Sequence, residues 1–264
     1  MLLTFLGTGT SCGVPTIGCE CEVCRSTDPH DKRLRCSALV ETATTRLLID
    51  CGPDFRQQIM PLPFRRIDGI LITHAHYDHM GGMDDIRPYC QFGEISVYAD
   101  ATACEGLLQM LPYCFADNRY PGVPAIGLHE ITPHVPLVIG DLRIVPFQVM
   151  HGKLPISAFR ITETGAGAAS ADLTYITDMK TIDEGELPYV MGTRLLVVNA
   201  LRPQPHHSHQ TLGEAVDFAR KVGAQRTLLI HPSHHIGLHE AVNRSLPPDI
   251  QLAYDGQTVD TRHL

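Results

Sequence analysis

The segment Thr73-His74-Ala75-His76-Tyr77-Asp78-His79 gathers three imidazoles and one carboxylate within six residues, directly after an apolar run. Neutral imidazole and carboxylate are ligands that suit divalent metals such as Zn, Mn and Fe. An open catalytic metal usually takes three protein ligands, so four such groups on one short turn favour a division between two metals. The alternative is a solvated histidine-rich loop, which the preceding strand and the following Gly81-Gly82 disfavour.

Six apolar runs, including the one before His74, each end at a polar residue. In five of the six cases this residue is a histidine or an aspartate, which can bind a metal. These positions are Asp50, His74, His151, Asp178, Asn199 and His231. Open sheets bind ligands beyond the carboxyl ends of their strands, so we expect these side chains to converge on one edge. Strands that simply end at polar residues would explain one or two cases, but not five.

A second cluster consists of thiols. Cys19-Glu20-Cys21-Glu22-Val23-Cys24 places three cysteines within six residues, and three thiolates with one histidine form a closed structural zinc site. His234, three residues after His231, is our first choice for the fourth ligand. The alternative is three ordinary reduced cysteines. Most of the other cysteines lack such spacing and are predicted to be packed core thiols.

Composition narrows the class of protein. The chain has 264 residues, 44% of them hydrophobic and 19% charged, which is typical of a globular protein. A net charge of −8 disfavours binding to nucleic acid. Nine cysteines, an odd number, indicate mostly reduced thiols and a cytoplasmic location. We find no membrane span, and the first residues resemble a strand more than a signal peptide.

The elements that must position these residues are many short strands and a few helices, typical of an α/β layered fold. We expect helices over 101–111, 212–221 and 238–245, and the second has a capping box at Thr211 and Glu214 and a stop signal at Gly223. Residues 164–171 read as a hairpin loop. Strands are expected at 2–6, 38–41, 46–49, 69–72, 95–98, 142–145, 173–177, 195–198 and 227–230.

The histidine segment, written His74-x-His76-x-Asp78-His79, resembles the signature of the metallo-β-lactamase superfamily, and the later strand ends supply His151, Asp178 and His231 in the order of that family. The resemblance implies an αββα sandwich that forms a single domain over 1–264, with the cysteine loop at about 18–25. It also implies two metals. His74, His76 and His151 would hold the first, Asp78, His79 and His231 the second, and Asp178 would bridge them.

A further histidine is assigned by a narrower resemblance. His209-Gln210-Thr211-Leu212-Gly213-Glu214-Ala215 is similar to the motif of the phosphodiesterase branch, in which such a histidine protonates the leaving oxygen or stabilises phosphoryl charge. His209 and Asp78 are therefore the candidate catalytic residues, and a surface histidine is the alternative for His209. His206 and His207 are expected to support the site or face solvent.

The run Gly7-Thr8-Gly9-Thr10-Ser11-Cys12-Gly13-Val14-Pro15, followed by the cysteine loop and His231 with His234, resembles the phosphoribosyl 1,2-cyclic phosphate phosphodiesterase group of bacterial phosphonate degradation. That group holds a structural zinc and often manganese in the active pair. Asn199, often acidic in relatives, and Cys12, in a variable loop, depart from the pattern and leave the substrate open.

Two carboxylates, Asp50 and Asp54, are candidates to orient a ligand histidine, with Asp50 favoured because it ends a strand. For Asp54 we prefer the role of an acid at a helix N-terminus. Three arginines are candidates to contact a substrate phosphate, namely Arg56, Arg87 and Arg202. For Arg87, a salt bridge to Asp84 or Asp85 is the favoured role.

Together these features predict a dinuclear phosphodiesterase that hydrolyses a small or cyclic phosphate ester through a metal-bridging hydroxide, with Mn or Zn in the pair and one structural zinc. A tRNA 3′-processing endonuclease and a thioester or lactone hydrolase are the alternatives within the superfamily. A non-catalytic metal-binding module is disfavoured because the ligand set is complete. We expect a small phosphate ester as partner and no membrane, and the resemblance allows a homodimer.

Overall fold

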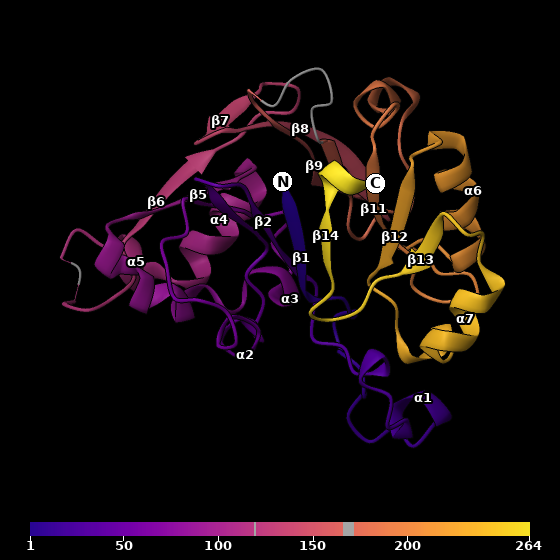
Figure 1. The fold of residues 1–264 in the computed structure, drawn as a ribbon. Helices are drawn as coiled ribbons and strands as arrows, with labels where there is room; N and C mark the ends of the chain where they lie inside the picture. Colours follow the sequence, from indigo (N-terminus) through magenta and orange to yellow (C-terminus); the bar gives the residue numbers. More distant parts are fainter. Residues whose placement is uncertain (119, 166–171) are drawn as a thin grey trace.

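Two seven-stranded sheets pack face to face in the computed structural model, which describes residues 1–118, 120–165 and 172–264 (Figure 1). In sheet order, the first sheet contains β14 (Thr258–Asp260), β1 (Leu2–Gly7), β2 (Ser37–Glu41), β3 (Arg46–Ile49), β4 (Gly69–Leu71), β5 (Ile95–Ala99) and β6 (Ile126–Glu130). The second contains β13 (Ile250–Leu252), β12 (Arg226–Ile230), β11 (Leu195–Asn199), β10 (Asp172–Tyr175), β9 (Leu154–Glu163), β8 (Leu142–His151) and β7 (Leu137–Ile139).

Each sheet is half parallel and half antiparallel. Strands β3 to β6 run parallel in the first sheet, and β10 to β13 run parallel in the second. The remaining pairs, such as β1 with β2 and β8 with β9, are antiparallel. The parallel strands direct their carboxyl ends toward the same edge, which is where ligands bind in such sheets.

The central core lies between the sheets. In β3, Leu47 and Ile49 face the second sheet while Leu48 faces the helices, and all three side chains are fully buried. The second sheet contributes Phe159 and Tyr175 to the same central cluster. Because both faces of β3 are covered, Leu47–Ile49 is an unbroken apolar run instead of an alternating one.

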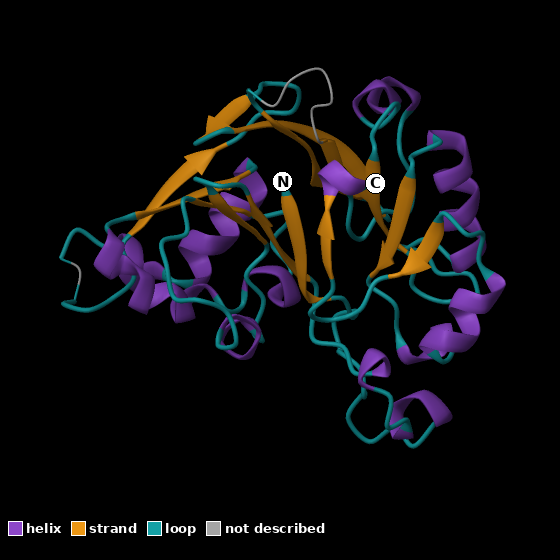
Figure 2. Cartoon of the chain, in the orientation of Figure 1, coloured by secondary structure: helices purple, strands orange, loops and turns teal. Residues whose placement is uncertain are grey.

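Helical segments cover the outer face of each sheet, which confirms the predicted αββα sandwich (Figure 2). On the first sheet these segments are α2 (Phe55–Ile59), α3 (Tyr77–Met80), η2 (Met83–Phe92), α4 (Ala101–Met110) and α5 (Pro112–Phe115). On the second they are η3 (Glu184–Tyr189), η4 (His234–Ile236), α6 (Leu212–Val222) and α7 (His239–Ser245). The other short helices are α1 (Glu22–Arg25), η1 (Pro29–Asp31) and η5 (Thr261–His263).

The expected helices and strands are present within two residues of their predicted bounds, except that the strand predicted at 142–145 extends to His151 as β8. The capping box of α6 forms between Thr211 and Glu214, and Gly223 ends the helix with a φ of 68°. Strands β9 and β10 pair antiparallel on either side of the predicted hairpin loop, whose residues 166–171 lie outside the described part. None of the described helices has the length and apolar character needed to span a membrane.

Candidate metal centre

Seven side chains from both sheets meet at the edge where the parallel strands end. His74 and His76 lie on the loop after β4, while Asp78 and His79 belong to α3. The second sheet contributes a residue at the end of β8 and residues after β10 and β12, namely His151, Asp178 and His231. Convergence of strand ends that are distant in sequence is what the pattern of polar residues predicts.

These side chains form two groups that share Asp178. In the first group, one donor atom each from His74, His76, His151 and Asp178 lies within 4.8 Å of the others. The Nε2 of His74 is 2.9 Å from the Nδ1 of His76 and 3.8 Å from Oδ2 of Asp178. Burial comes first among the causes that lower the pKa of His74, so this imidazole is neutral and able to donate an electron pair to a metal.

The second group consists of Asp78, His79, Asp178 and His231, again with donor atoms within 4.8 Å. The Nε2 of His79 is 3.2 Å from Oδ2 of Asp78 and 3.4 Å from Oδ2 of Asp178. The Nε2 of His231 is 3.2 Å from Oδ1 of Asp178. The Asp178 carboxylate therefore lies between the two groups, in the position of a bridging ligand.

The donor set fits two divalent metals. The Nε2 atoms of His79 and His231 are buried, and neither forms a hydrogen bond within the described part of the chain. Buried polar atoms are normally satisfied, and a cation between imidazoles and carboxylates would satisfy both nitrogens. Burial alone would raise the pKa of Asp178, but the nearby imidazoles of His231 and His79 hold it well below its usual range. Asp178 is therefore ionised, as a ligand must be.

Hydrogen bonds from outside the two groups fix the orientation of the imidazoles. His79 donates from Nδ1 to Oδ2 of Asp50 at 2.7 Å, and Thr73 donates from N and Oγ1 to the same carboxylate. His151 donates from Nδ1 to the carbonyl oxygen of Ser208 at 2.9 Å. Asp50 thus contacts a site histidine, as expected. Asp54 precedes α2 without capping it through its side chain, and its carboxylate instead accepts from Arg35.

The role of Asn199, a departure from the family pattern, is not evident from the sequence. The buried Asn199 side chain accepts from the backbone N of Met179 at 2.7 Å and donates to the carbonyl of Met179 at 3.0 Å. It therefore clamps the backbone directly after Asp178. Asp50, Asp178 and His231 all have positive φ, between 53° and 61°, a conformation that persists only where surrounding contacts enforce it.

His209 lies beside both groups. Its ring centroid is 4.6 Å from that of His151, in the first group, and 4.9 Å from that of His231, in the second. It is 9% exposed, and burial followed by the charge of His231 lowers its pKa to about 3. Its outer side is covered by the half-buried His206, with ring centroids 5.0 Å apart, whereas His207 is exposed.

The cysteine loop forms a separate group with the histidine expected from the sequence. Donor atoms of Cys19, Cys21, Cys24 and His234 lie within 4.8 Å of one another. The Nδ1 of His234 is 3.2 Å from Sγ of Cys19 and 3.3 Å from Sγ of Cys21. The contact with His234 leads the causes that lower the pKa of Cys21 to about 6. Three sulfurs and one imidazole nitrogen match the donor set of a closed zinc site.

None of the three candidate arginines forms a hydrogen bond or an ion pair with a side chain of the two donor groups in the described part of the chain. Arg87 donates to both carboxylate oxygens of Asp84, as expected. Arg202 donates to backbone carbonyls of its own loop, at Gln204 and Pro205. Arg56 lines a cavity between α2 and η2. None of these contacts supports a role in binding phosphate.

Comparison with known proteins identifies the family. A model described as a beta-lactamase superfamily domain matches residues 45–232. Together with the fold and the donor groups, this match shows that the chain belongs to the metallo-β-lactamase superfamily.

Within the superfamily the chain is similar to a crystal structure described as a new diphosphatase from the PhnP family. The two are 36% identical with a TM-score of 0.88, and the match covers 98% of this chain and 96% of that one. This likeness supports the narrower group indicated by the cysteine loop.

Two sequence relatives carry other names. An octanoyltransferase from Porphyromonas gingivalis is 43% identical over 97% of this chain, but the chain spans only 51% of the length of that protein. A ribonuclease Z from Methanopyrus kandleri is 26% identical, with 89% of this chain and 94% of the relative covered.

Proposed function

We propose that the chain is a dinuclear metal-dependent phosphodiesterase that hydrolyses a small or cyclic phosphate ester. The observation that carries the proposal is the position of His209, whose ring contacts His151 of one donor group and His231 of the other. A phosphoryl group that spans the two metals would therefore lie against this imidazole.

The roles of the residues follow from their positions. The bound metals would supply an activated water and stabilise the charge on the phosphoryl oxygens. Asp178 would fix the spacing of the two donor groups because its carboxylate belongs to both. Asp78, at 3.2 Å from the Nε2 of His79, would complete the second group and help to orient the water. His209 would give its proton to the leaving oxygen.

Burial, followed by the charge of His231, lowers the pKa of His209 and favours the neutral imidazole before substrate binds. A phosphate anion against the ring would favour the imidazolium form and raise this pKa. The proton would thus be taken up with the substrate and released to the leaving alkoxide, which requires it.

The need of the leaving group for a proton distinguishes a phosphodiester from an organic diphosphate as substrate. The PhnP-family relative is described as a diphosphatase, and an organic diphosphate is therefore the second candidate. Its leaving group is a phosphate, which departs without full protonation, whereas an alkoxide from a phosphodiester needs a proton. An RNA substrate, suggested by the ribonuclease Z relative, is disfavoured by the net charge of −8.

We also propose that Cys19, Cys21, Cys24 and His234 hold a structural zinc, and that the active pair is Mn or Zn. His234 follows His231 by three residues, so this zinc would anchor the cysteine loop next to the active edge.

Hydrolysis assays with the Mn-loaded and Zn-loaded protein test the proposal. The panel comprises bis(p-nitrophenyl) phosphate, a 2′,3′-cyclic nucleotide, an organic diphosphate, a thioester and a lactone. His209→Ala is compared with His129→Ala, an exposed histidine on β6. We expect His209→Ala to lower turnover of the cyclic nucleotide by about 10²–10⁴-fold and that of the p-nitrophenyl ester much less, because nitrophenolate leaves without a proton.

Cleavage of only the thioester or lactone would overturn the phosphodiesterase assignment. Efficient diphosphate cleavage without phosphodiester cleavage would favour the second candidate. Equal losses of turnover on the cyclic nucleotide and on the p-nitrophenyl ester in His209→Ala would contradict the proposed proton transfer from His209.

A further inference from the structure

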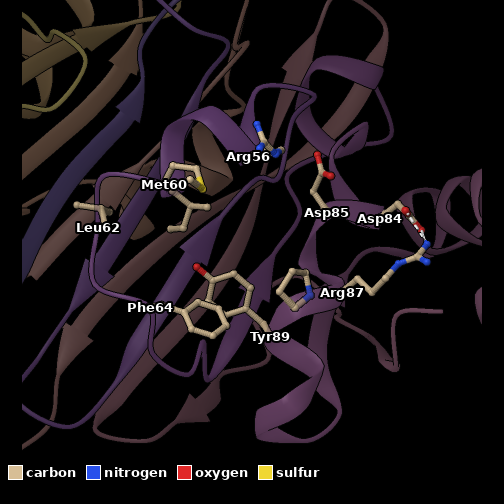
Figure 3. A pocket seen from close by; sticks show the side chains of 10 residues that line it. Arg56, Met60, Leu62, Phe64, Asp84, Asp85, Arg87 and Tyr89 are labelled. Atoms are coloured by element: carbon tan, nitrogen blue, oxygen red, sulfur yellow. Dashed lines mark hydrogen bonds and ion pairs between the residues drawn. The ribbon is translucent and has the colours of Figure 1, made fainter. Parts of the chain in front are cut away.

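A cavity of about 410 Å³ lies between α2 and η2, on the helical side of the first sheet and apart from the seven metal-site side chains (Figure 3). Its walls are the chain segments that follow Asp50 and His79. These segments are joined by a hydrogen bond from the N of Gly82 to the carbonyl of Cys51 at 2.9 Å. None of the functions proposed above uses this cavity.

One side of this cavity is apolar although it is open to water. Met60 is 68% exposed and Phe64 is 52% exposed, and both line the cavity with Leu62. Phe64 contacts the ring of Tyr89, with centroids 4.8 Å apart, so the aromatic surface continues inward. Large apolar side chains grouped and exposed in this way often mark a binding site.

Tyr89 places its hydroxyl at the cavity. The residue is only 4% exposed and its hydroxyl forms no hydrogen bond with any described residue, but the oxygen is open to water. Figure 3 shows this oxygen on the side of Met60, so a ligand in the cavity could take the place of water at the hydroxyl.

Two opposite charges on the other side are also available. Arg56 and Asp85 both line the cavity, and Figure 3 shows their side chains in the part of the view away from Phe64. Within the described residues, neither side chain forms an ion pair or a hydrogen bond. Their neighbours differ, because Arg87 is paired with Asp84, which also accepts from the hydroxyl of Tyr113.

From this arrangement we propose that the cavity binds a small zwitterion with an apolar body, of the class of aromatic or branched α-amino acids. The carboxylate of the ligand would pair with Arg56 and its ammonium with Asp85. The side chain of the ligand would lie on Met60, Leu62 and Phe64, near the hydroxyl of Tyr89. A purely anionic ligand would leave Asp85 unpaired beside its own charge, and a purely cationic ligand would do the same to Arg56.

The absence of tryptophan from the sequence provides a direct test. Phe64→Trp places a single tryptophan at the cavity in the full-length, metal-loaded protein. Val138→Trp, on the exposed part of β7, is the control. The probes are L-phenylalanine, 3-phenylpropionate, which lacks the ammonium, and phenethylamine, which lacks the carboxylate.

We expect L-phenylalanine to give a saturable change in tryptophan emission in Phe64→Trp only, and to raise the melting temperature of the unmodified chain. Each of the two analogues should bind at least about tenfold more weakly than L-phenylalanine, the loss of affinity expected when a hydrogen bond to a charged group is removed. Arg56→Gln and Asp85→Asn should weaken binding similarly. Arg66→Gln, an exposed arginine paired with Asp68 outside the cavity, should leave it unchanged.

Three results would overturn the proposal. The first is no response to L-phenylalanine by either emission or melting temperature. The second is binding that does not depend on Arg56 and Asp85, which would place the amino acid at the metal centre. The third is a tryptophan emission of Phe64→Trp that changes with protein concentration in the absence of ligand, together with dimer formation in sedimentation velocity. This result would assign this face to contact with a second copy of the chain.

Discussion

His79 donates a hydrogen bond from Nδ1 to Asp50 at 2.7 Å, and both side chains are completely buried. The bond fixes the tautomer of His79, because a proton on Nδ1 leaves Nε2 free to face Asp78 and Asp178. The same carboxylate accepts from the backbone N of Thr73 at 2.8 Å, one residue before His74. Asp50 thus positions parts of both donor groups without belonging to either.

Asp50→Asn is therefore expected to weaken metal binding. The amide keeps the shape of the carboxylate but loses its charge, and metal affinity should fall by about 10–100-fold. Competition with a chelating indicator measures this change. Asp54→Asn is the matched control, since the Asp54 carboxylate pairs with Arg35 instead of a site histidine. Equal affinities in the two variants would contradict the orienting role of Asp50.

The grouping of the donor atoms could be anticipated from the sequence because the residues are concentrated in short motifs and at strand ends. Local spacing marks His74 to His79 and Cys19 to Cys24, and strand ends mark Asp178 and His231. His234 is assigned to the cysteine group because three thiolates need one more ligand and His234 follows His231 by three residues. Asn199 was noted but its role was not predicted, because an amide that clamps the backbone of Met179 leaves no pattern in the sequence. The cavity between α2 and η2 leaves no pattern in the sequence either, since Arg56 and Asp85 line it together only after these segments have packed.

Asp178→Ala tests whether the two donor groups share a ligand. Both groups lose the same carboxylate, so bound metal in the active pair should fall from about two equivalents to one or fewer. Metal analysis after dialysis measures the content, with Asp183→Ala as an exposed control near the same strand. Retention of both metals would show that Asp178 is dispensable for binding.

The cysteine group should become reactive when its metal is removed. The pKa of Cys21, about 6, makes this thiol mostly thiolate at pH 7, whereas burial first of all raises that of Cys24 to about 11. After treatment with a chelator, iodoacetamide should therefore modify Cys21 well before Cys24, and zinc should protect both. Mass spectrometry of timed samples gives the order. Preferential labelling of Cys24, or equal labelling with and without zinc, would contradict the assignment.

His239 should make stability depend on pH. Its Nδ1 accepts from Nη2 of the buried Arg33 at 3.0 Å, and burial, followed by the charge of Arg33, lowers the pKa of His239 to about 4. The unfolded chain binds this proton near pH 6.5, so it takes up more protons than the folded chain between these two values.

The contribution of His239 to the free energy of unfolding is therefore complete above pH 6.5 and is lost as the pH falls toward 4. The loss should be about 2 kcal/mol, less than the full shift implies because the side chain is not wholly isolated from water. Urea unfolding of the wild type and of His239→Gln at several pH values measures it. Since glutamine does not titrate, the difference in the free energy of unfolding between the two proteins should shrink as the pH falls from 6.5 to 4. A constant difference would show that protonation of His239 does not cause the pH dependence.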